Sequence, residues 1–181
     1  MYGWNGEILR VDLASGKVSR EELDKYLAKE FIGGRGLGVK TLYEELEPKI
    51  DPLSPENKLI FAAGPVTGTK APTSGRYCVV SKSPLTSTVF DSHSGGFWGP
   101  ELKFAGYDAI IIEGRANKPV YIWVADEQVE IRGASDFWGL DTHTTTEKLV
   151  KETDPKAKVA CIGPAGERLV LISAIINDKH R

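Results

Sequence analysis

The feature that most limits the fold of this chain is a set of short, continuously apolar runs bounded by glycine and proline. Runs of this length, rich in isoleucine, valine and aromatic residues, predict β-strands rather than helices. Because apolar residues do not alternate with polar ones, we expect both faces of these strands to be covered. The predicted strands are residues 59–63, 77–81, 108–113 and 120–125.

The amino-terminal segment shows a different pattern, in which apolar and charged residues alternate. In residues 7–13 the leucines and the valine share one face, and the arginine and the aspartate share the other. A Ser-Gly pair follows, and a further short β-like segment covers residues 18–20. This arrangement predicts a half-buried β-hairpin.

Three segments have helical patterns. Apolar residues recur at helical spacing in residues 23–31, which end at a glycine pair, and in residues 39–46, which end before a proline. Residues 141–153 are a third predicted helix, capped by Asp141 or by the threonine after it. We interpret the glycine-rich residues 33–38 as a turn between the first two helices, because their spacing is not that of a dinucleotide-binding fingerprint.

Two segments of the chain are similar to each other. Residues 60–65 and 160–164 are each an apolar strand that ends in Gly-Pro, followed by a β-rich stretch and then by an arginine, Arg76 or Arg181. An internal duplication would build two similar halves around one site, and a chance match of this length is equally open. The apolar segments of the second half are the predicted strand 158–162 and the long run 169–176.

The composition is that of one soluble globular domain, with 41% apolar and 27% charged residues, and no linker divides residues 1–181. The net charge is -2 and the basic residues are scattered, so we expect no nucleic-acid partner. The amino terminus lacks a signal-peptide pattern, and no run approaches the ~18 apolar residues of a membrane helix. We therefore expect a cytoplasmic protein without a membrane partner.

The chain has two cysteines, Cys78 and Cys161, each inside an apolar β-like run. We expect both to be buried packing thiols. Two thiols cannot supply the four thiolate ligands of a cubane iron-sulfur cluster, so any such cluster must be ligated elsewhere.

The strongest candidate site lies in residues 73–106. An arginine follows a glycine at Gly75-Arg76, a β-branched run leads away, and the segment Ser92-His93-Ser94-Gly95-Gly96 precedes a predicted short helix. A helix start offers unpaired N–H groups with positive partial charge, and glycines let a ligand approach the backbone closely. We expect this loop to hold an anion such as a phosphate, with Arg76 as a nearby cation, although turn glycines without a ligand are the commoner case.

Three charged residues, Glu101, Lys103 and Asp108, are acid-base candidates by residue type alone. Each lies where helix capping or solvation explains it, and we therefore assign no catalytic residue in this chain.

Much of the chain resembles one known family. The segments LSPENKLIFAAGPVTGTKAPTSGRY, KSPLT, SGGFWGPELKFAGYDAIIIEG and KPVYIWV are similar to the amino-terminal domain of the tungsten-dependent aldehyde ferredoxin oxidoreductases. The resemblance runs from MYGW at the start, through IGPAGERLV, to NDKHR at the end. It implies an α+β fold with two mixed or largely antiparallel β-sheets and flanking helices, which form a platform under a bis-pterin tungsten cofactor.

The resemblance also implies roles for particular residues. The family arginine that corresponds to Arg76 contacts the pterin and helps connect it to the iron-sulfur cluster. His93 corresponds to a position that is commonly Asn, whose main-chain carbonyl helps hold a magnesium ion between the pterin phosphates. Because a carbonyl survives the change to histidine, this backbone role is retained, and we favour it over a metal-ligand role for the imidazole. Ser94, Gly95 and Gly96 fit the family's cofactor loop.

His180 and Arg181 correspond to the start of a second glycine-arginine phosphate loop in the family. Here the sequence stops at Arg181, so half of that loop is missing. We expect Arg181 to contact the cofactor. The sequence is typical of a fragment, or of a subunit completed by another chain, and we expect it to need the missing part of the loop in order to bind the cofactor tightly.

For the whole enzyme the resemblance implies oxidation of an aldehyde plus water to a carboxylic acid, with electrons passing through a 4Fe-4S cluster to ferredoxin. Molybdenum in place of tungsten, and assembly as a homodimer, are open. The iron-sulfur and substrate domains would lie outside this chain, which alone would be inactive. Two alternatives stay open: a non-catalytic module that binds a phosphorylated ligand or a partner subunit, and a related enzyme acting on other acyl or aromatic thioesters.

Overall fold

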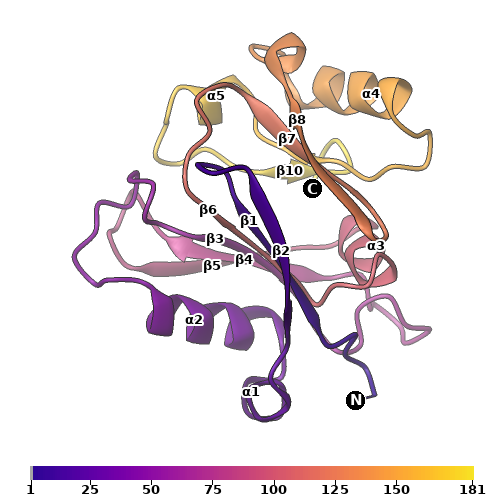
Figure 1. Ribbon diagram of the computed structural model, residues 1–181. Helices are drawn as coiled ribbons and strands as arrows, with labels where there is room; N and C mark the ends of the chain where they lie inside the picture. The colour runs from indigo at the N-terminus through magenta and orange to yellow at the C-terminus, as the bar shows by residue number, and fades with distance from the viewer. Residues whose placement is uncertain (1) are drawn as a thin grey trace.

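The computed structural model describes residues 2–181, and a six-stranded mixed sheet is its central element (Figure 1). The strand order is β2-β1-β6-β3-β4-β5. Strands β1 and β6 are parallel and the other neighbours are antiparallel. The strands are β1 (Glu7–Asp12), β2 (Lys17–Glu22), β3 (Leu59–Ala63), β4 (Tyr77–Lys82), β5 (Val89–Ser94) and β6 (Ala109–Glu113).

The amino-terminal hairpin and the apolar strands form as the sequence predicts. Leu9 and Val11 of β1 point to one face of the sheet, and Ile8 points to the other. Strand β4 is buried along its whole length, with Cys78 and Val80 on the same face as Ile8. Two separate hydrophobic clusters, one on each face, therefore hold the sheet.

Two helices, α1 (Lys25–Phe31) and α2 (Gly34–Glu45), cover one face of the sheet (Figure 1). The interpretation of residues 33–38 as a turn is wrong, because α2 begins at Gly34. The physical reason is close packing on β4: a Cβ on Gly38 would lie 2.6 Å from a methyl carbon of Val80. The glycines of this segment let the helix approach the strand, so tertiary contact overrides their low helix propensity.

The other face is covered by α3 (Trp98–Phe104) and by a separate hairpin of β7 (Val120–Ala125) and β8 (Gln128–Gly133). Side chains of β7 are only half-buried, so the prediction that both its faces are covered is wrong. The reason is an apolar cavity that lies between this hairpin and the central sheet.

The carboxy-terminal region consists of η1 (Ser135–Phe137), α4 (Thr142–Glu152), α5 (Pro164–Glu167) and a two-stranded sheet of β9 (Ala160–Cys161) and β10 (Ile176–Asn177). The Asp141 side chain accepts hydrogen bonds from the amides of His143 and Thr144, which confirms the predicted cap. Residues 169–175 form turns and irregular backbone, and Ile176 belongs to β10. The side chains from Leu169 to Ile172 are exposed, so no sheet partner draws this segment into extended pairing.

The α+β class with mixed and antiparallel sheets is confirmed, with one large sheet and two small ones. The internal duplication stays a prediction. Strands β3 and β9 each end in Gly-Pro and each pair antiparallel with a later strand. However, Arg76 immediately precedes its strand, whereas Arg181 follows β10. None of the helices between residues 2 and 181 is both long and apolar enough to cross a bilayer.

Candidate functional site

The predicted site residues meet at one end of the β4–β5 pair. Tyr77 pairs with Ser94 as the last pair of the ladder, so Arg76 and Gly95 leave the sheet side by side. The two turns touch, because a Cβ on Gly75 would lie 2.6 Å from the carbonyl oxygen of Gly96. Only glycine at position 75 allows this approach.

The third component is the turn at the carboxy-terminal end, and Asn177 fixes it against the other two. This side chain is fully buried. Its Oδ1 accepts hydrogen bonds from the Tyr77 hydroxyl at 3.0 Å and from the Ser94 hydroxyl at 2.5 Å, and its Nδ2 donates to the carbonyl of Gly95 at 3.0 Å. The backbone N–H of Asn177 also donates to the backbone carbonyl of Arg181 at 2.7 Å. One buried amide side chain therefore connects all three segments.

The start of α3 is not free to bind an anion, contrary to the sequence prediction. Residues 92–94 belong to β5 rather than to a helical turn, and the Phe97 amide donates to the carboxylate of Asp178 at 2.8 Å. The same carboxylate would lie 2.2 Å from a Cβ on Gly96, whose φ of 97° also requires glycine. An internal carboxylate therefore already satisfies this helix end.

The remaining anion donors at this site are side-chain cations. Arg76 and Arg181 are both exposed, and neither forms an ion pair within residues 2–181. The Cδ of Arg181 would lie 3.3 Å from a Cβ on Gly96, so this side chain lies directly against the glycine turn. The ammonium of Lys158 lies 5.5 Å from the ring centroid of Phe97. Arg181 and Lys158 thus bring positive charge to the turn of Gly95 and Gly96, beside the Asp178 carboxylate that bonds the Phe97 amide.

The site rests on a rigid support. The Thr67 hydroxyl donates to the carbonyl of Arg76 at 2.8 Å and accepts from the Gly64 amide at 3.1 Å. Below it, the rings of Tyr77 and Trp98 pack with centroids 4.7 Å apart. Burial raises the pKa of Tyr77 to about 12, so this hydroxyl stays a neutral hydrogen-bond donor. The backbone around Arg76 is therefore held before any ligand arrives.

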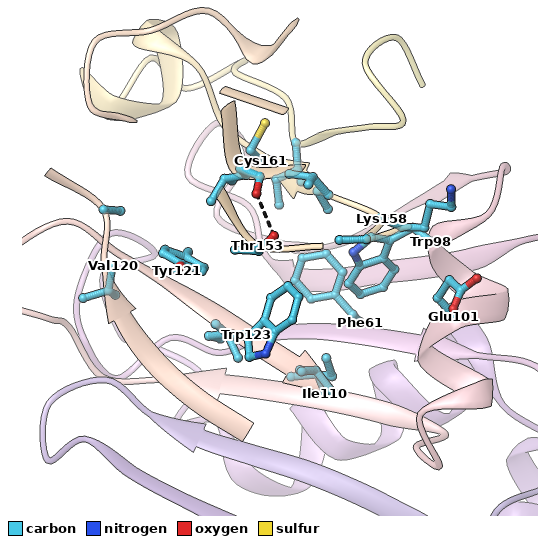
Figure 2. A pocket seen from close by; sticks show the side chains of 18 of the residues that line it. Phe61, Trp98, Glu101, Ile110, Val120, Tyr121, Trp123, Thr153, Lys158 and Cys161 are labelled. Carbon is cyan, nitrogen blue, oxygen red and sulfur yellow. Dashed lines mark hydrogen bonds between the residues drawn. The ribbon is translucent and has the colours of Figure 1, made fainter. Parts of the chain in front are cut away.

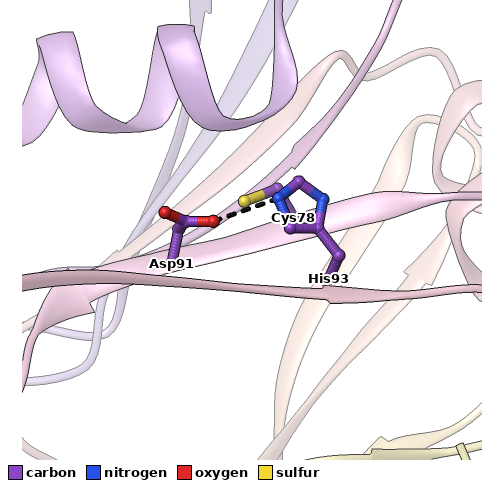
Figure 3. Close-up of side chains that lie close together, drawn as sticks. All are labelled: Cys78, Asp91 and His93. Atoms are coloured by element: carbon purple, nitrogen blue, oxygen red, sulfur yellow. Dashed lines mark hydrogen bonds and ion pairs between the residues drawn. The ribbon is translucent and has the colours of Figure 1, made fainter.

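His93 is the one predicted site residue whose side chain points elsewhere. Successive side chains of a strand alternate between faces, so the imidazole lies on the α2 face, opposite to Ser94 (Figure 3). Its Nε2 lies 3.0 Å from a carboxylate oxygen of Asp91. The guanidinium of Arg35 contacts both, at 2.8 Å to Asp91 and 3.3 Å to His93. Only the backbone of His93 lies at the glycine turn.

Of the two cysteines, Cys78 is buried as predicted and lies beside this group, while Cys161 is only partly buried. Burial, assisted by the Asp91 carboxylate, raises the pKa of the Cys78 thiol to about 11. The thiol is therefore protonated at neutral pH and is not an activated nucleophile.

The acid-base candidates Lys103 and Asp108 form a buried ion pair. Asp108 also accepts hydrogen bonds from the amides of Asn5 and Gly6, and the Lys103 ammonium donates to the carbonyl of Gly3. The pair therefore fixes the amino-terminal segment. The expectation that solvation explains these two residues is wrong, but their structural role is consistent with assigning them no catalysis.

The large cavity lies away from these turns, between the β7–β8 hairpin and the central sheet (Figure 2). Its volume is about 660 Å³. Aromatic and aliphatic side chains, including Phe61, Trp98 and Trp123, line it, and none of the predicted site residues does.

Sequence reasoning gave no role to Asn177 or Asp178, although both lie in the NDKHR segment used for the family resemblance. A polar residue in a short β-strand gives no signal of burial by itself. Only the tertiary packing of β10 against the end of the β4–β5 pair shows that Asn177 faces Tyr77 and Ser94.

With the geometry described, comparison with known proteins settles the family. The sequence profile of the aldehyde ferredoxin oxidoreductase amino-terminal domain matches residues 8–181. The chain belongs to the aldehyde ferredoxin oxidoreductase family. It is 56% identical over 182 residues to the tungsten-containing aldehyde ferredoxin oxidoreductase of Pyrococcus furiosus, and 53% identical to that of Thermococcus kodakarensis. Both comparisons cover all of this chain and 30% of the relative, so the chain spans about a third of these enzymes.

Other relatives are named for different activities. The chain is 38% identical to the WOR-like subunit of the aliphatic sulfonate oxidoreductase of Pyrococcus furiosus, and the comparison covers 97% of this chain and 30% of the relative. A solved active-site complex of benzoyl coenzyme A reductase superposes with a TM-score of 0.96 and 42% identity over 97% of this chain and 27% of that one. The fold is therefore shared by enzymes that act on different substrates.

Proposed function

We propose that this chain is the cofactor-binding amino-terminal domain of a tungsten bis-pterin oxidoreductase. The names of the relatives most similar in sequence, all tungsten-containing aldehyde ferredoxin oxidoreductases, support the tungsten assignment. A single domain over residues 1–181 is part of the same proposal. Molybdenum is the alternative metal.

The proposal rests mainly on one observation: the turn at Gly75 touches the turn of Gly95 and Gly96, and two arginines without ion-pair partners in the described residues lie in or beside these turns. Arg76 and Arg181 flank the turn of Gly95 and Gly96, and a Cβ at either Gly75 or Gly96 would collide with its neighbours. Glycine lets a ligand approach the backbone closely, and Arg donates two parallel hydrogen bonds to a phosphate. The residues present fit the phosphate ends of a pterin cofactor.

The chain's own residues bind and orient the cofactor in this proposal. Arg76 and Arg181 neutralise phosphate charge, Gly95 and Gly96 allow close approach, and Ser94 and Asn177 hold the turn in place. The backbone carbonyl of His93 is the proposed magnesium ligand, since its imidazole is directed to the α2 face. The bound metal-pterin group would supply the two-electron chemistry of aldehyde oxidation to carboxylic acid.

The electron-transfer and acid-base parts lie outside these 181 residues in this proposal. Two cysteines cannot ligate a 4Fe-4S cluster, so the cluster belongs to the larger part of the enzyme that the relatives possess. Ferredoxin and the aldehyde would be partners of that whole enzyme. Cytoplasmic location and homodimer formation complete the proposal.

The exposed apolar run at Leu169–Ile172 supports a further part of this assignment. A monomer seldom exposes several large apolar residues in sequence, and here Leu169, Val170, Leu171 and Ile172 are all exposed. We assign this run as a contact with the rest of the enzyme, which the relatives carry in the other two-thirds of their length.

A related enzyme acting on another substrate is the second candidate. The likeness to benzoyl coenzyme A reductase at 42% identity favours it over a non-catalytic module. Substrate choice would be made by residues outside this chain.

The test is metal analysis and turnover of the native-length protein. We expect about one tungsten and a pterin cofactor per chain, and reduction of ferredoxin when an aldehyde is added. Tungsten with turnover on an aromatic thioester only would favour the second candidate. A protein purified from tungsten-replete cells without tungsten, molybdenum or pterin would contradict both.

A further inference from the structure

A second group of ligand-type side chains lies on the opposite face of the same strands. The Sγ of Cys78, a carboxylate oxygen of Asp91 and a ring nitrogen of His93 all lie within 4.8 Å of one another (Figure 3). The strand register explains the grouping. Cys78 of β4 is directly opposite His93 of β5, and Asp91 is two residues from His93 and therefore on the same face.

We propose that Cys78, Asp91 and His93 bind a divalent transition-metal ion, with zinc as the preferred ion. Thiolate, imidazole and carboxylate are the three ligand types of protein zinc sites, and three protein ligands leave one position for water. The Cys78 thiol would release its proton to solvent as the zinc–sulfur bond forms, so binding should strengthen as the pH rises. The mixed donor set excludes magnesium and calcium as preferred ions, because both favour all-oxygen ligands.

The geometry needs only side-chain adjustment. The Nε2 of His93 and the Oδ2 of Asp91 are 3.0 Å apart. Tetrahedral zinc bond lengths place ligand atoms about 3.3 to 3.6 Å from each other, so the thiol must move inward by about an ångström. The His93 and Asp91 side chains are 37% and 26% exposed, whereas Cys78 is 1% exposed. The ion would therefore enter from the solvent side and meet the thiol at the base of the site.

Arg35 of α2 is the group that an ion must displace. Its guanidinium donates to the Asp91 carboxylate at 2.8 Å and lies 3.3 Å from the His93 ring nitrogen. The Arg35 side chain is 62% exposed, so it can turn into solvent without opening the core. A guanidinium and a metal ion would then compete for one carboxylate, and removal of the guanidinium should favour the metal.

This site is separate from the proposed cofactor turn. Ser94 and Asn177 lie on the other face of the β4–β5 pair, and the ligands here contact α2 instead. The side chain of His93 thus has a use that its backbone role at the turn does not require. The zinc proposal does not depend on tungsten or pterin binding.

The experiment is a titration of the native-length protein with zinc chloride, and separately with cobalt chloride. We expect one zinc equivalent that competes with a chromophoric chelator, and a thiolate-to-cobalt charge-transfer band. Cys78→Ser should abolish the band and weaken zinc binding by at least about a hundredfold. Cys161→Ser is the matched control, since that thiol hydrogen-bonds with Thr142 and Thr146 and belongs to no group of metal-ligand side chains in the described residues, and it should change neither.

If the Cys78 variant fails to fold, two variants of more exposed residues still test zinc binding. His93→Asn should weaken zinc binding about as much as loss of the thiol, and Arg35→Gln should strengthen it about tenfold. Absence of a cobalt thiolate band in the unmodified protein, or zinc affinity that none of these substitutions changes, would overturn the proposal.

Discussion

The two ends of the chain are packed to different degrees. Up to β6, the central sheet has a hydrophobic cluster on each face, and strands β3, β4 and β6 are almost fully buried. Beyond residue 118, Phe137 and Leu149 are the buried apolar side chains, and the cavity and the exposed run Leu169–Ile172 lie in or beside this part. The first region supplies nearly all of the fully buried apolar side chains, and the second covers one face of its sheet while leaving apolar surface of its own exposed.

The candidate cofactor site lies where these two regions meet. Its Arg76 and Gly95–Gly96 turns extend from the well-packed β4–β5 pair, and its third turn, with Asn177 and Arg181, comes from the loosely packed region. A rigid part that holds the turns, joined to a part with unfilled surface, suits a domain that presents a ligand to further protein. The comparison therefore predicts that substitutions in the two regions have different effects.

The largest expected effect is in the central sheet. Ile111→Ala removes a side chain that is buried between neighbouring strands and should lower the free energy of unfolding by about 2 to 5 kcal/mol. Ile122→Ala, on the half-buried β7 strand beside the cavity, should cost about 1 kcal/mol, because its surroundings are already incompletely packed. Urea unfolding of the chain measures both. Equal losses would remove the distinction between the two regions.

The next effect is at the connection between them. Asn177→Ala leaves the Tyr77 and Ser94 hydroxyls and the Gly95 carbonyl without their buried partner, and should cost about 2 kcal/mol. Amide hydrogen exchange should also show faster opening of residues 94–97 than of β4. Asn117→Ala on an exposed loop is the control and should be neutral. Unchanged exchange at the turn would show that Asn177 does not join the regions.

The smallest effect concerns charge in the first region. Burial by itself would raise the pKa of the Glu45 carboxyl. The hydrogen bond and the charge of Arg10, together with the charge of Lys58, have the larger combined effect and hold this pKa below the usual 4.5. A lowered folded-state pKa means that this stabilisation is present above pH 4.5 and is lost as pH falls through the folded value. Because these groups are partly exposed, the loss should stay below about 1 kcal/mol.

Unfolding of the unmodified chain and of Glu45→Gln between pH 7 and pH 3 measures this contribution. The variant should be less stable at pH 7, and its stability should fall less as the pH is lowered. Parallel pH profiles would exclude Glu45 as a source of acid sensitivity.

The sequence predicted those elements whose signal is local. Alternation gave the amino-terminal hairpin, apolar runs gave β3, β4 and β6, and Asp141 marked the start of α4. Each of these patterns depends on residues a few positions apart. The family resemblance supplied the roles of Arg76 and Arg181, which residue type alone would have left as surface arginines.

The features that were missed depend on distant contacts. Gly34 and Gly38 are helical because α2 must approach β4 closely, which the glycine run alone does not indicate. The burial of Asn177 follows from packing of β10 against the end of the β4–β5 pair, where Tyr77 lies 100 positions earlier in the chain. The meeting of Cys78 with His93 follows from the pairing of β4 with β5 across 15 positions. The sequence marked residues 169–176 as a long apolar run, and no partner strand pairs with most of it in the part of the chain described.

The central claim is that Arg76 and Arg181 together hold the phosphorylated ends of a metal-pterin cofactor at a glycine turn. The most direct measurement is the tungsten-to-protein ratio of the native-length double variant Arg76→Ala, Arg181→Ala, purified beside Arg115→Ala, whose arginine lies at the opposite end of the sheet. We predict a loss of at least about tenfold in bound tungsten in the double variant, and no loss in the control. Full tungsten content in the double variant would contradict the account.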